Sequence, residues 1–324
     1  MSEMKYMDAI RIALEEEMER DPNVILYGED VELGYVFQVT QGIIDKFGPS
    51  RVRDTPISEN VIVGSGVGAA LGGIRPVPEI QMSDFMALAM DQLSNQAAKL
   101  RYMSGGQLTV PMTIRAPIGC VANFAAQHSQ CMYAWYAHVP GLYVVAPSTP
   151  YDAKGLLKSS IRNDNPVVFL EHKQLYHTKG EVPDEEYLLP LGKADVKREG
   201  GDVTIVGCAK MVIKALSAAE ELAKKHGIEA GVVDLRSIVP LDFETIAAEV
   251  KKTGRLVVVD EGAKSFGIGA EIAARAAEEL IDYLDAPIVR VGEPDTPIPF
   301  CTVLENEVIP DEDDIIQAVL KTFD

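Results

Sequence analysis

Two acidic residues lie at positions in the sequence where their side chains could contact a ligand. Glu59 follows Ser58 at the start of a glycine- and alanine-rich stretch, 60–72, which we expect to form a helix that Ser58 caps. A carboxylate in a first helical turn is favoured by the helix dipole, so Glu59 is either a capping group or a group aimed at a ligand. Because glycines make a poor helix, we expect another group to approach this helix closely.

The second acid is Glu29, which comes just after a short apolar strand expected over 24–27. Sheets of alternating α/β proteins bind ligands at the carboxyl ends of their strands. Gly28-Glu29-Asp30 is therefore a second place where a polar ligand could bind.

His128 lies in a loop, 116–130, that has few large apolar side chains. Imidazole titrates near neutrality, so His128 could exchange protons with a thiol or an alcohol. A single histidine is more often structural, and both interpretations stay open on the residues alone. The remaining histidines have no metal-ligand spacing, and we interpret them as structural: His138, His172, His177 and His226.

Strand-like and helix-like stretches alternate along the chain, which predicts an α/β protein with mostly parallel sheets covered by helices on both faces. A polar stretch divides it into domains of residues 1–180 and 196–324, joined by a linker over 181–195. The expected strands are 24–27, 76–80, 112–115, 142–147, 167–170, 204–206, 230–235, 256–259 and 288–291. The expected helices are 4–20, 40–47, 60–72, 83–103, 150–162, 210–226, 242–252, 268–281 and 313–322.

Composition excludes several classes of protein. A chain of 324 residues with 47% hydrophobic residues can bury a large core, and a net charge of −19 argues against nucleic-acid binding. No apolar run approaches 18 residues and the start is not a signal peptide, so we expect no membrane contact and a cytoplasmic location. The four cysteines have no C-x-x-C spacing, which favours free thiols. The acidic run Asp311–Asp314 is either a helix start or a docking surface for a basic partner.

A competing motif lies over the same glycine-rich stretch. Residues 61–69 match the G-x-G-x-x-A fingerprint of dinucleotide-binding proteins, with Glu79 and Asp84 roughly where a ribose-binding acid would stand. The apolar run before Gly64 is short, and Pro76 and Pro78 suit an interior strand poorly. An NAD-binding oxidoreductase is thus one alternative, and a non-catalytic assembly subunit is another.

Two further motifs carry a resemblance to a known family. With Asp54-Thr55-Pro56-Ile57-Ser58-Glu59 and Ala125-Ala126-Gln127-His128-Ser129-Gln130, the chain resembles the beta subunit of the thiamine-diphosphate-dependent first component of 2-oxo acid and acetoin dehydrogenase complexes, a transketolase-like family. The resemblance extends through 95–103, 147–157, 190–195 and 233–237, and so covers essentially the whole chain. It implies a transketolase-like pyrimidine-binding domain followed by a transketolase C-terminal-like domain.

The resemblance also implies roles for individual residues. Glu59 would hydrogen-bond N1′ of the cofactor's aminopyrimidine, and Phe85 would stack on that ring. Glu29 and Gln81 would lie near the cofactor, and His128 would assist acyl transfer to the lipoyl group of the complex's second component. The substrate would be pyruvate, a branched-chain 2-oxo acid or acetoin; residues 179–183 and the C-terminal half look closest to the acetoin type, with pyruvate a near second.

Two ions follow from the same resemblance. A potassium ion would be held by Met112, Ser160, Ile161, Asn163 and Asn165, although the family often has an aspartate where this chain has Asn163. Thiamine enzymes hold the diphosphate through Mg²⁺ on a Gly-Asp-Gly run, whereas the only Gly-Asp here is Gly201-Asp202-Val203. We therefore expect an alpha subunit, in an α₂β₂ assembly, to supply the diphosphate half of the site.

Overall fold

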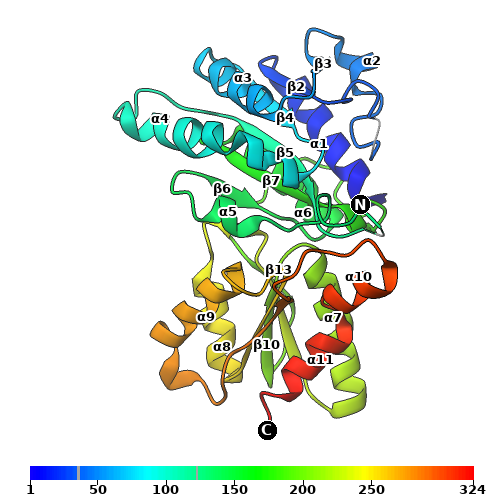
Figure 1. Ribbon diagram of the computed structural model, residues 1–324, viewed down its shortest axis with the longest axis vertical. Coiled ribbons are helices and arrows are strands. Elements are labelled where there is room, and N and C mark those ends of the chain that lie inside the picture. The colour runs from blue at the N-terminus through cyan, green and yellow to red at the C-terminus, as the bar shows by residue number, and fades with distance from the viewer. Residues whose placement is uncertain (35–36, 122) are drawn as a thin grey trace. The chain divides into compact units, whose positions relative to one another are not determined.

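The computed structural model describes residues 1–34, 37–121 and 123–324 (Figure 1). They form two compact units. The first unit contains residues 1–118 and 135–191, and the second contains residues 119–134 and 192–324. Residue 122 of the expected histidine loop lies outside the described residues.

The first unit is built on a parallel sheet with strand order β6-β7-β5-β4-β2-β3. The interior strands β5 and β7 are buried at every position, which is typical of parallel sheets covered on both faces. The strands are β2 (Val24–Gly28), β3 (Val52–Asp54), β4 (Arg75–Glu79), β5 (Thr113–Ile118), β6 (Tyr143–Val145) and β7 (Val167–His172).

Helices cover this sheet, and α1 (Tyr6–Arg20) packs against α6 (Pro150–Arg162). The helix α3 (Glu59–Leu71) packs on β4 and on the helical segment that follows β4. The remaining helical segments of this region are short: α2 (Ile43–Phe47), α5 (Tyr133–Ala137) and η3 (Lys173–Leu175).

The single helix predicted over 83–103 is wrong in detail. The chain forms a 3₁₀ segment η1 (Ser83–Ala89), then a π-helical segment η2 (Gln92–Ala97), then α4 (Ala98–Met103). In a 3₁₀ segment residues three apart lie on the same face. The buried face of η1 contains Ser83, Met86 and Ala89, and Leu88, which stands between two of them in the sequence, is 67% exposed.

A strand pair also replaces two expected features of the first unit. β1 (Ser2–Lys5) pairs antiparallel with β8 (Lys179–Val182), where the sequence predicted a helix from residue 4 and a linker from residue 181. Both segments are polar and mostly exposed. They therefore lack the apolar alternation by which a strand is recognised in sequence.

The second unit has its own sheet, with order β14-β13-β10-β11-β9, in which only β9 runs antiparallel to its neighbour. Its strands are β9 (Asp195–Arg198), β10 (Val203–Gly207), β11 (Ala230–Asp234), β13 (Leu256–Ala263) and β14 (Val289–Glu293); β12 (Ser237–Val239) also belongs to this stretch of chain. Its helices are α7 (Lys210–His226), α8 (Phe243–Thr253), α9 (Ile268–Glu279), η4 (Ile281–Tyr283), α10 (Thr302–Val308) and α11 (Glu312–Leu320).

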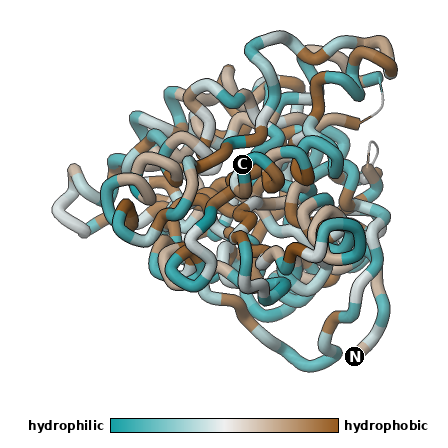
Figure 2. The backbone as a smooth tube through the Cα atoms, turned by 90° about the horizontal axis from the view of Figure 1, so that it is seen from below, coloured by the Kyte–Doolittle hydropathy of each residue, from teal (hydrophilic) through white to brown (hydrophobic). Residues whose placement is uncertain are grey.

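Figure 1 shows α7 and α11 on one side of this sheet and α8 and α9 on the other. The core between the sheet and the first pair includes Met211, Ala215, Leu222, Val232, Ile315 and Val319. Hydrophobic stretches run mostly through the interior, and hydrophilic ones through the outer turns (Figure 2). The predicted α/β class, with two mostly parallel sheets flanked by helices, is confirmed.

The acidic run near the end of the chain is a helix start. Asp311 is the N-cap of α11, its side chain accepts from the Asp314 backbone N–H, and the Asp314 side chain accepts from the Asp311 N–H. This reciprocal capping box confirms the helix-start interpretation for these two residues.

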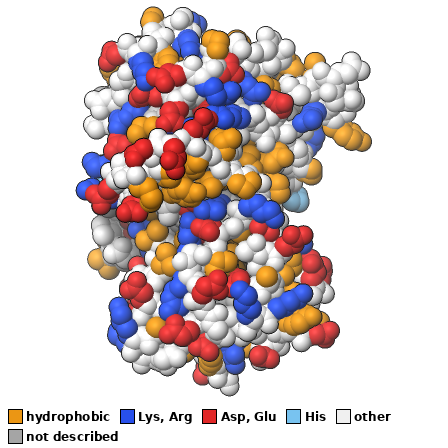
Figure 3. Space-filling view, turned by 180° about the vertical axis from the view of Figure 1, so that it is seen from behind, with side chains coloured by type: hydrophobic (Ala, Val, Ile, Leu, Met, Phe, Trp, Pro, Cys, Tyr) orange, Lys and Arg blue, Asp and Glu red, His pale blue; other side chains and the backbone are white. Residues whose placement is uncertain are grey.

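Acidic and basic side chains are interspersed over the molecular face that Figure 3 shows. Across the described ranges, no helix combines the length and the apolar character that a membrane span requires.

Candidate cofactor site and histidine loop

Glu59 is the first residue of α3 and is 6% exposed. The connection from β3 is held by the Thr55 backbone N–H, which donates to the carbonyl oxygen of Gly28 at 2.9 Å. Ser58 occupies the N-cap position, but its side chain makes no capping hydrogen bond and instead donates to the Asn60 amide oxygen. The capping role predicted for the Ser58 side chain is therefore wrong, although the position of the helix start is right.

The small residues of α3 allow it to lie directly on the sheet. A Cβ atom added to Gly66 would lie 2.5 Å from the Met112 sulfur and 2.6 Å from the Tyr27 hydroxyl oxygen. The same Tyr27 hydroxyl donates to the carbonyl oxygen of Ile62 at 3.0 Å, and burial raises the Tyr27 pKa to about 12. The close approach that the glycines predicted is thus present, and it fixes the helix start that carries Glu59.

Glu29 lies at the end of β2, where two strands come very close. A Cβ atom at Gly28 would lie 2.4 Å from the carbonyl oxygen of Glu79 on β4, so only glycine fits there. The Gln81 side-chain amide donates to the backbone oxygen of Glu29 at 2.9 Å. This bond uses the backbone of Glu29 and not its side chain. The Oε1 atom of that side chain is buried without a hydrogen-bond partner.

Electrostatics distinguish Glu29 from an ordinary surface glutamate. Burial, together with the nearby charges of Glu59 and Asp30, raises the pKa of Glu29. The hydroxyl oxygen of Thr55 is a further buried atom without a partner. Buried polar atoms are normally satisfied, so these orphaned atoms, which follow β2 and β3, fit a polar ligand that donates and accepts hydrogen bonds.

Phe85 and Gln81 follow β4. Gln81 is partly buried, and Phe85 is partly buried in η1, whose first residue Ser83 accepts from the Tyr136 hydroxyl at 3.0 Å. Glu29, Glu59 and the pair Gln81 and Phe85 thus follow β2, β3 and β4, three adjacent parallel strands. Their carboxyl ends form one edge of the sheet, the usual ligand position in such folds. An aromatic ring, carboxylates and a donor amide are groups that suit a flat polar heterocycle.

His128 belongs to the second unit, because residues 119–134 pack with residues 192–324. It is partly exposed, its ring lies 6.4 Å from the Phe124 ring in an edge-on arrangement, and its backbone N–H donates to the carbonyl oxygen of Ala125. The first unit therefore contains Glu29, Glu59, Gln81 and Phe85, and the second contains His128.

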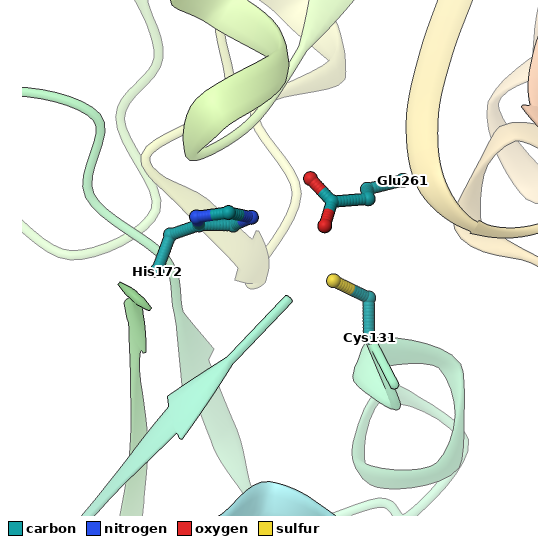
Figure 4. A group of neighbouring side chains, drawn as sticks. All are labelled: Cys131, His172 and Glu261. Carbon is teal, nitrogen blue, oxygen red and sulfur yellow. The ribbon is translucent and has the colours of Figure 1, made fainter. Parts of the chain in front are cut away.

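Sequence reasoning missed a group of buried acids and thiols in the second unit. The side chains of Cys131 and Glu261 point toward each other, with the sulfur and a carboxylate oxygen within 4.8 Å (Figure 4). Burial raises the pKa of Asp260 to about 6 and, with the charges of Glu261 and Asp260, that of Glu293 to about 9. Burial also raises the pKa of the Cys131 thiol. The expectation of free thiols is confirmed for all four cysteines. Asp260 and Glu261 lie on β13, whereas Glu293 lies on β14 and Cys131 comes from a distant part of the chain, so no single motif in the sequence predicts the group.

The residues expected to hold potassium are oxygen donors of the right kind, but most are already engaged. Arg75 donates to the carbonyl oxygens of Ile161 at 3.0 Å and Asn163 at 3.2 Å, and pairs with Asp164 at 2.6 Å. The Asn163 side-chain oxygen accepts from Asn165, and the carbonyl oxygen of Met112 accepts from Val167. The Ser160 hydroxyl donates to Leu156. A carbonyl oxygen has two lone pairs, so an ion here would share these oxygens with the arginine.

Two sequence motifs have no ligand role in the fold. The G-x-G-x-x-A stretch lies wholly inside α3, whereas a dinucleotide fingerprint must form the turn between a strand and a helix. The dinucleotide interpretation is therefore wrong. Asp202 of the Gly-Asp pair accepts from the backbone N–H of Glu229 at 2.7 Å, in the turn before β10. It is a structural turn residue and not part of a diphosphate site.

Comparison with known proteins identifies a family for both parts of the chain. Residues 2–179 match the family model described as "Transketolase, pyrimidine binding domain", and residues 192–315 match "Transketolase, C-terminal domain". A solved structure titled "Split gene transketolase, inactive beta4 tetramer" has a TM-score of 0.82 and 25% sequence identity, with 98% of each chain covered.

Curated relatives are closer in sequence. The chain is 49% identical to a mitochondrial pyruvate dehydrogenase E1 component subunit beta-1 of Oryza sativa subsp. japonica, over 98% of this chain and 86% of the relative. It is 47% identical to the 2-oxoisovalerate dehydrogenase subunit beta of Bacillus subtilis, over 98% of both chains. It is 46% identical to the acetoin:2,6-dichlorophenolindophenol oxidoreductase subunit beta of the same organism, over 97% and 95%. The chain belongs to the transketolase-like family of beta subunits of thiamine-dependent 2-oxo acid and acetoin dehydrogenase first components.

Proposed function

We propose that this chain is the beta subunit of a thiamine-diphosphate-dependent 2-oxo acid or acetoin dehydrogenase first component. The observation that carries the proposal is the group at the ends of β2, β3 and β4. There Glu59 lies buried at the start of α3 and its charge acts on Glu29, while the Oε1 atom of Glu29 and the hydroxyl of Thr55 are buried without a hydrogen-bond partner. Such a site can bind the aminopyrimidine of thiamine. Its ring nitrogens accept hydrogen bonds, and its amino group donates them.

Within that site, each residue has a distinct role. Glu59 holds a proton between its carboxylate and a ring nitrogen, and Phe85 offers an aromatic face on which the ring can lie. Glu29, whose pKa burial raises, keeps a proton more readily than a free glutamate and so limits the negative charge beside Glu59. Gln81 fixes the backbone from which Glu29 projects. Thiamine diphosphate, when bound, supplies the nucleophilic carbon and the electron sink for carbon–carbon bond cleavage.

His128 has the second catalytic role in the proposal. It is partly exposed in its loop, so a thiol could reach its ring. Imidazole is the side chain suited to exchanging a proton near neutral pH. We assign to it proton transfer during acyl delivery to the lipoyl group of the complex's second component. An assembly subunit without catalysis, the second alternative, would need neither Glu59 nor His128.

An alpha subunit is part of the proposal. The chain has no Gly-Asp-Gly run, and its only Gly-Asp pair has a structural role in a turn. The Mg²⁺ that binds the diphosphate therefore belongs to the alpha subunit. The outer face of α3, with Val61, Ser65, Gly68 and Leu71 exposed, is small and partly apolar, and it suits close packing in an α₂β₂ assembly. The domain limits of 1–180 and 196–324 and the linker 181–195 are part of the same proposal.

Substrate and potassium are the finer parts of the proposal. Relatives named for pyruvate, 2-oxoisovalerate and acetoin are 49%, 47% and 46% identical to this chain, which is too narrow a range to choose among them. We keep all three substrates, and we keep a potassium ion at the end of α6 that shares the carbonyl oxygens of Ile161 and Asn163 with Arg75. A cytoplasmic location also stays a prediction.

Reconstitution tests the proposed function. The chain is co-expressed with a candidate alpha subunit that carries a Gly-Asp-Gly run, and each substrate is tried with an artificial electron acceptor. We expect turnover with one of pyruvate, a branched-chain 2-oxo acid or acetoin, and only when thiamine diphosphate and Mg²⁺ are both present. A stable complex that turns over none of them would favour the assembly subunit, and turnover without thiamine diphosphate would contradict the proposal.

A further inference from the structure

The loop that carries His128 is fastened to the second unit by two buried glutamates. The backbone N–H of Cys120 donates to Glu261 Oε1 at 2.7 Å, and the backbone N–H of Asn123 donates to Glu305 Oε2 at 3.0 Å. Glu261 is 1% exposed and Glu305 is 5% exposed. These carboxylates lie far along the chain from the loop, on β13 and α10.

The loop conformation needs such support. Asn123 and Ala125 have φ angles of +66° and +59°, in the left-handed region. Asparagine tolerates this region, but an alanine there is strained and persists only where its surroundings hold it. The next described contact along the loop is the bond from the His128 N–H to the carbonyl oxygen of Ala125. The conformation at 123–125 therefore sets where the chain turns to present His128.

Asn123 is held through both its backbone and its side chain. Besides the bond from its backbone to Glu305, its side-chain amide donates to the carbonyl oxygen of Phe300 at 2.7 Å and to the Thr302 hydroxyl at 3.0 Å. Thr302 and Glu305 belong to α10, and Phe300 lies two residues before that helix begins. Glu305 is the carboxylate among these three acceptors, and hydrogen bonds to an ionised carboxylate are about twice as strong as bonds between neutral groups.

We propose that Glu261 and Glu305 are positioning residues that hold the His128 loop through the backbone amides of Cys120 and Asn123. Glu261 fixes the start of the loop and Glu305 fixes its strained centre. The consequence for catalysis rests on the role proposed for His128, but the anchoring itself does not. Neither glutamate needs to touch substrate or cofactor.

Hydrogen exchange on the purified full-length chain tests the anchoring without any assay of activity. Glu305→Ala removes the acceptor, Glu305→Gln keeps a neutral acceptor oxygen, and Glu307→Ala is the control, because Glu307 is exposed on the same helix. In peptides that cover 123–130, we expect exchange at least about tenfold faster in Glu305→Ala. We expect most of the protection to return in Glu305→Gln, and none to be lost in Glu307→Ala.

Exchange in 123–130 that stays at the wild-type rate in a folded Glu305→Ala variant would overturn the proposal. If that variant does not fold, Glu305→Asp replaces it, because the shorter side chain withdraws the carboxylate from the Asn123 backbone N–H and leaves the backbone conformation of Asn123 unchanged in type. Faster exchange in 123–130 is again the expected result, and an unchanged rate is again the contradicting one.

The reconstituted enzyme then separates the two proposals. Glu305→Ala should slow acyl transfer to lipoamide more than reduction of an artificial acceptor, with Glu305→Gln restoring most of the transfer. If the loop loosens as expected but His128→Ala leaves both activities intact, the anchoring stands and the catalytic role of His128 fails. If the loop loosens and His128→Ala acts as expected, but Glu305→Ala leaves transfer unchanged, the positioning role is wrong.

Discussion

Arg115 on β5 and Glu79 on β4 are direct neighbours in the register of the first sheet, and their side chains form an ion pair at 2.5 Å. The same guanidinium donates twice to Glu171, at 2.6 and 2.9 Å, and is only 1% exposed. Its backbone oxygen accepts from the N–H of Ile80, just before Gln81. One buried arginine therefore links the centre of the sheet to the loop that supports Glu29.

Replacing this arginine should leave the buried Glu171 and the partly buried Glu79 without their cation. We expect Arg115→Met to reduce the free energy of unfolding by about 3–5 kcal/mol, the cost of breaking a buried ion pair from one side. Urea unfolding measures the effect. Lys225→Met is the control, because Lys225 and Glu221 form an exposed pair on α7, and exposed ion pairs contribute little to stability. Equal losses in both variants would show that the Arg115 network does not stabilise the fold.

Glu59→Gln tests the carboxylate at the start of α3. We expect turnover of the reconstituted enzyme to fall by about 10²–10⁴-fold, the usual contribution of a positioned acid–base group, while thermal unfolding of the chain stays near the wild-type temperature. Asn60→Ala, at the next and exposed position, should keep most of the activity. Full activity in Glu59→Gln would mean that this residue only starts the helix.

The fold was predictable where local pattern and tertiary environment agree. The strands β2 and β4 and the helices α6 and α7 lie within a residue or so of their predicted limits, because their apolar residues have the spacing of the element that forms. The prediction failed where exposed polar residues form strands, in β1 and β8, and where the backbone changes helix type after Ser83. Those features depend on contacts between distant segments, which local pattern does not encode.

His128→Ala should divide the overall reaction. If the imidazole acts in acyl transfer, lipoamide acylation should fall by about 10²-fold or more, while reduction of an artificial acceptor, which follows the earlier cleavage step, falls much less. His138→Ala is the matched control, since His138 is exposed a few residues after the loop. Equal losses in the two assays would rule out this division of roles.

The pH dependence of stability should report the buried acids of the second unit. Burial and the charges of Glu261 and Asp260 raise the folded-state pKa of Glu293 from 4.5 to about 9. The folded state therefore binds more protons than the unfolded state between these values, and stability falls as the pH rises through this window. The slope contributed by one group is at most about 1.4 kcal/mol per pH unit.

Glu293→Gln removes this titration without removing the side chain's volume. We expect its free energy of unfolding to fall less steeply than that of the wild type between pH 5 and about 9, and to exceed it at the alkaline end. Glu244→Gln, at a position whose side chain is 95% exposed, should follow the wild-type curve. Parallel curves for Glu293→Gln and the wild type would mean that Glu293 is ionised in the folded protein at neutral pH.

The candidate site, like the fold, was predictable from the sequence only in part. Glu59 and Glu29 were predictable because each stands at the end of a recognisable strand or the start of a helix. The orphaned Thr55 hydroxyl, the Arg115 network and the anchoring of Asn123 by Glu305 were not, because each brings together residues from separate elements. The Arg75 guanidinium at the proposed potassium ligands also comes from another strand, so only the fold reveals that the two would share oxygens.

The isolated chain should bind thiamine diphosphate weakly or not at all. The diphosphate carries most of the cofactor's charge, and this chain has no Gly-Asp-Gly run to hold its Mg²⁺. Glu59 and Phe85 offer one hydrogen bond and one stacked ring, together a few kcal/mol at most, which is less than the cost of immobilising a ligand of this size. Calorimetry with Mg²⁺ should detect no binding to the pure chain and clear binding once the alpha subunit is added. Because Glu59→Gln removes only the pyrimidine contact, the assembled variant should still bind the cofactor, more weakly. Micromolar binding by the chain alone would contradict a site shared between unlike subunits.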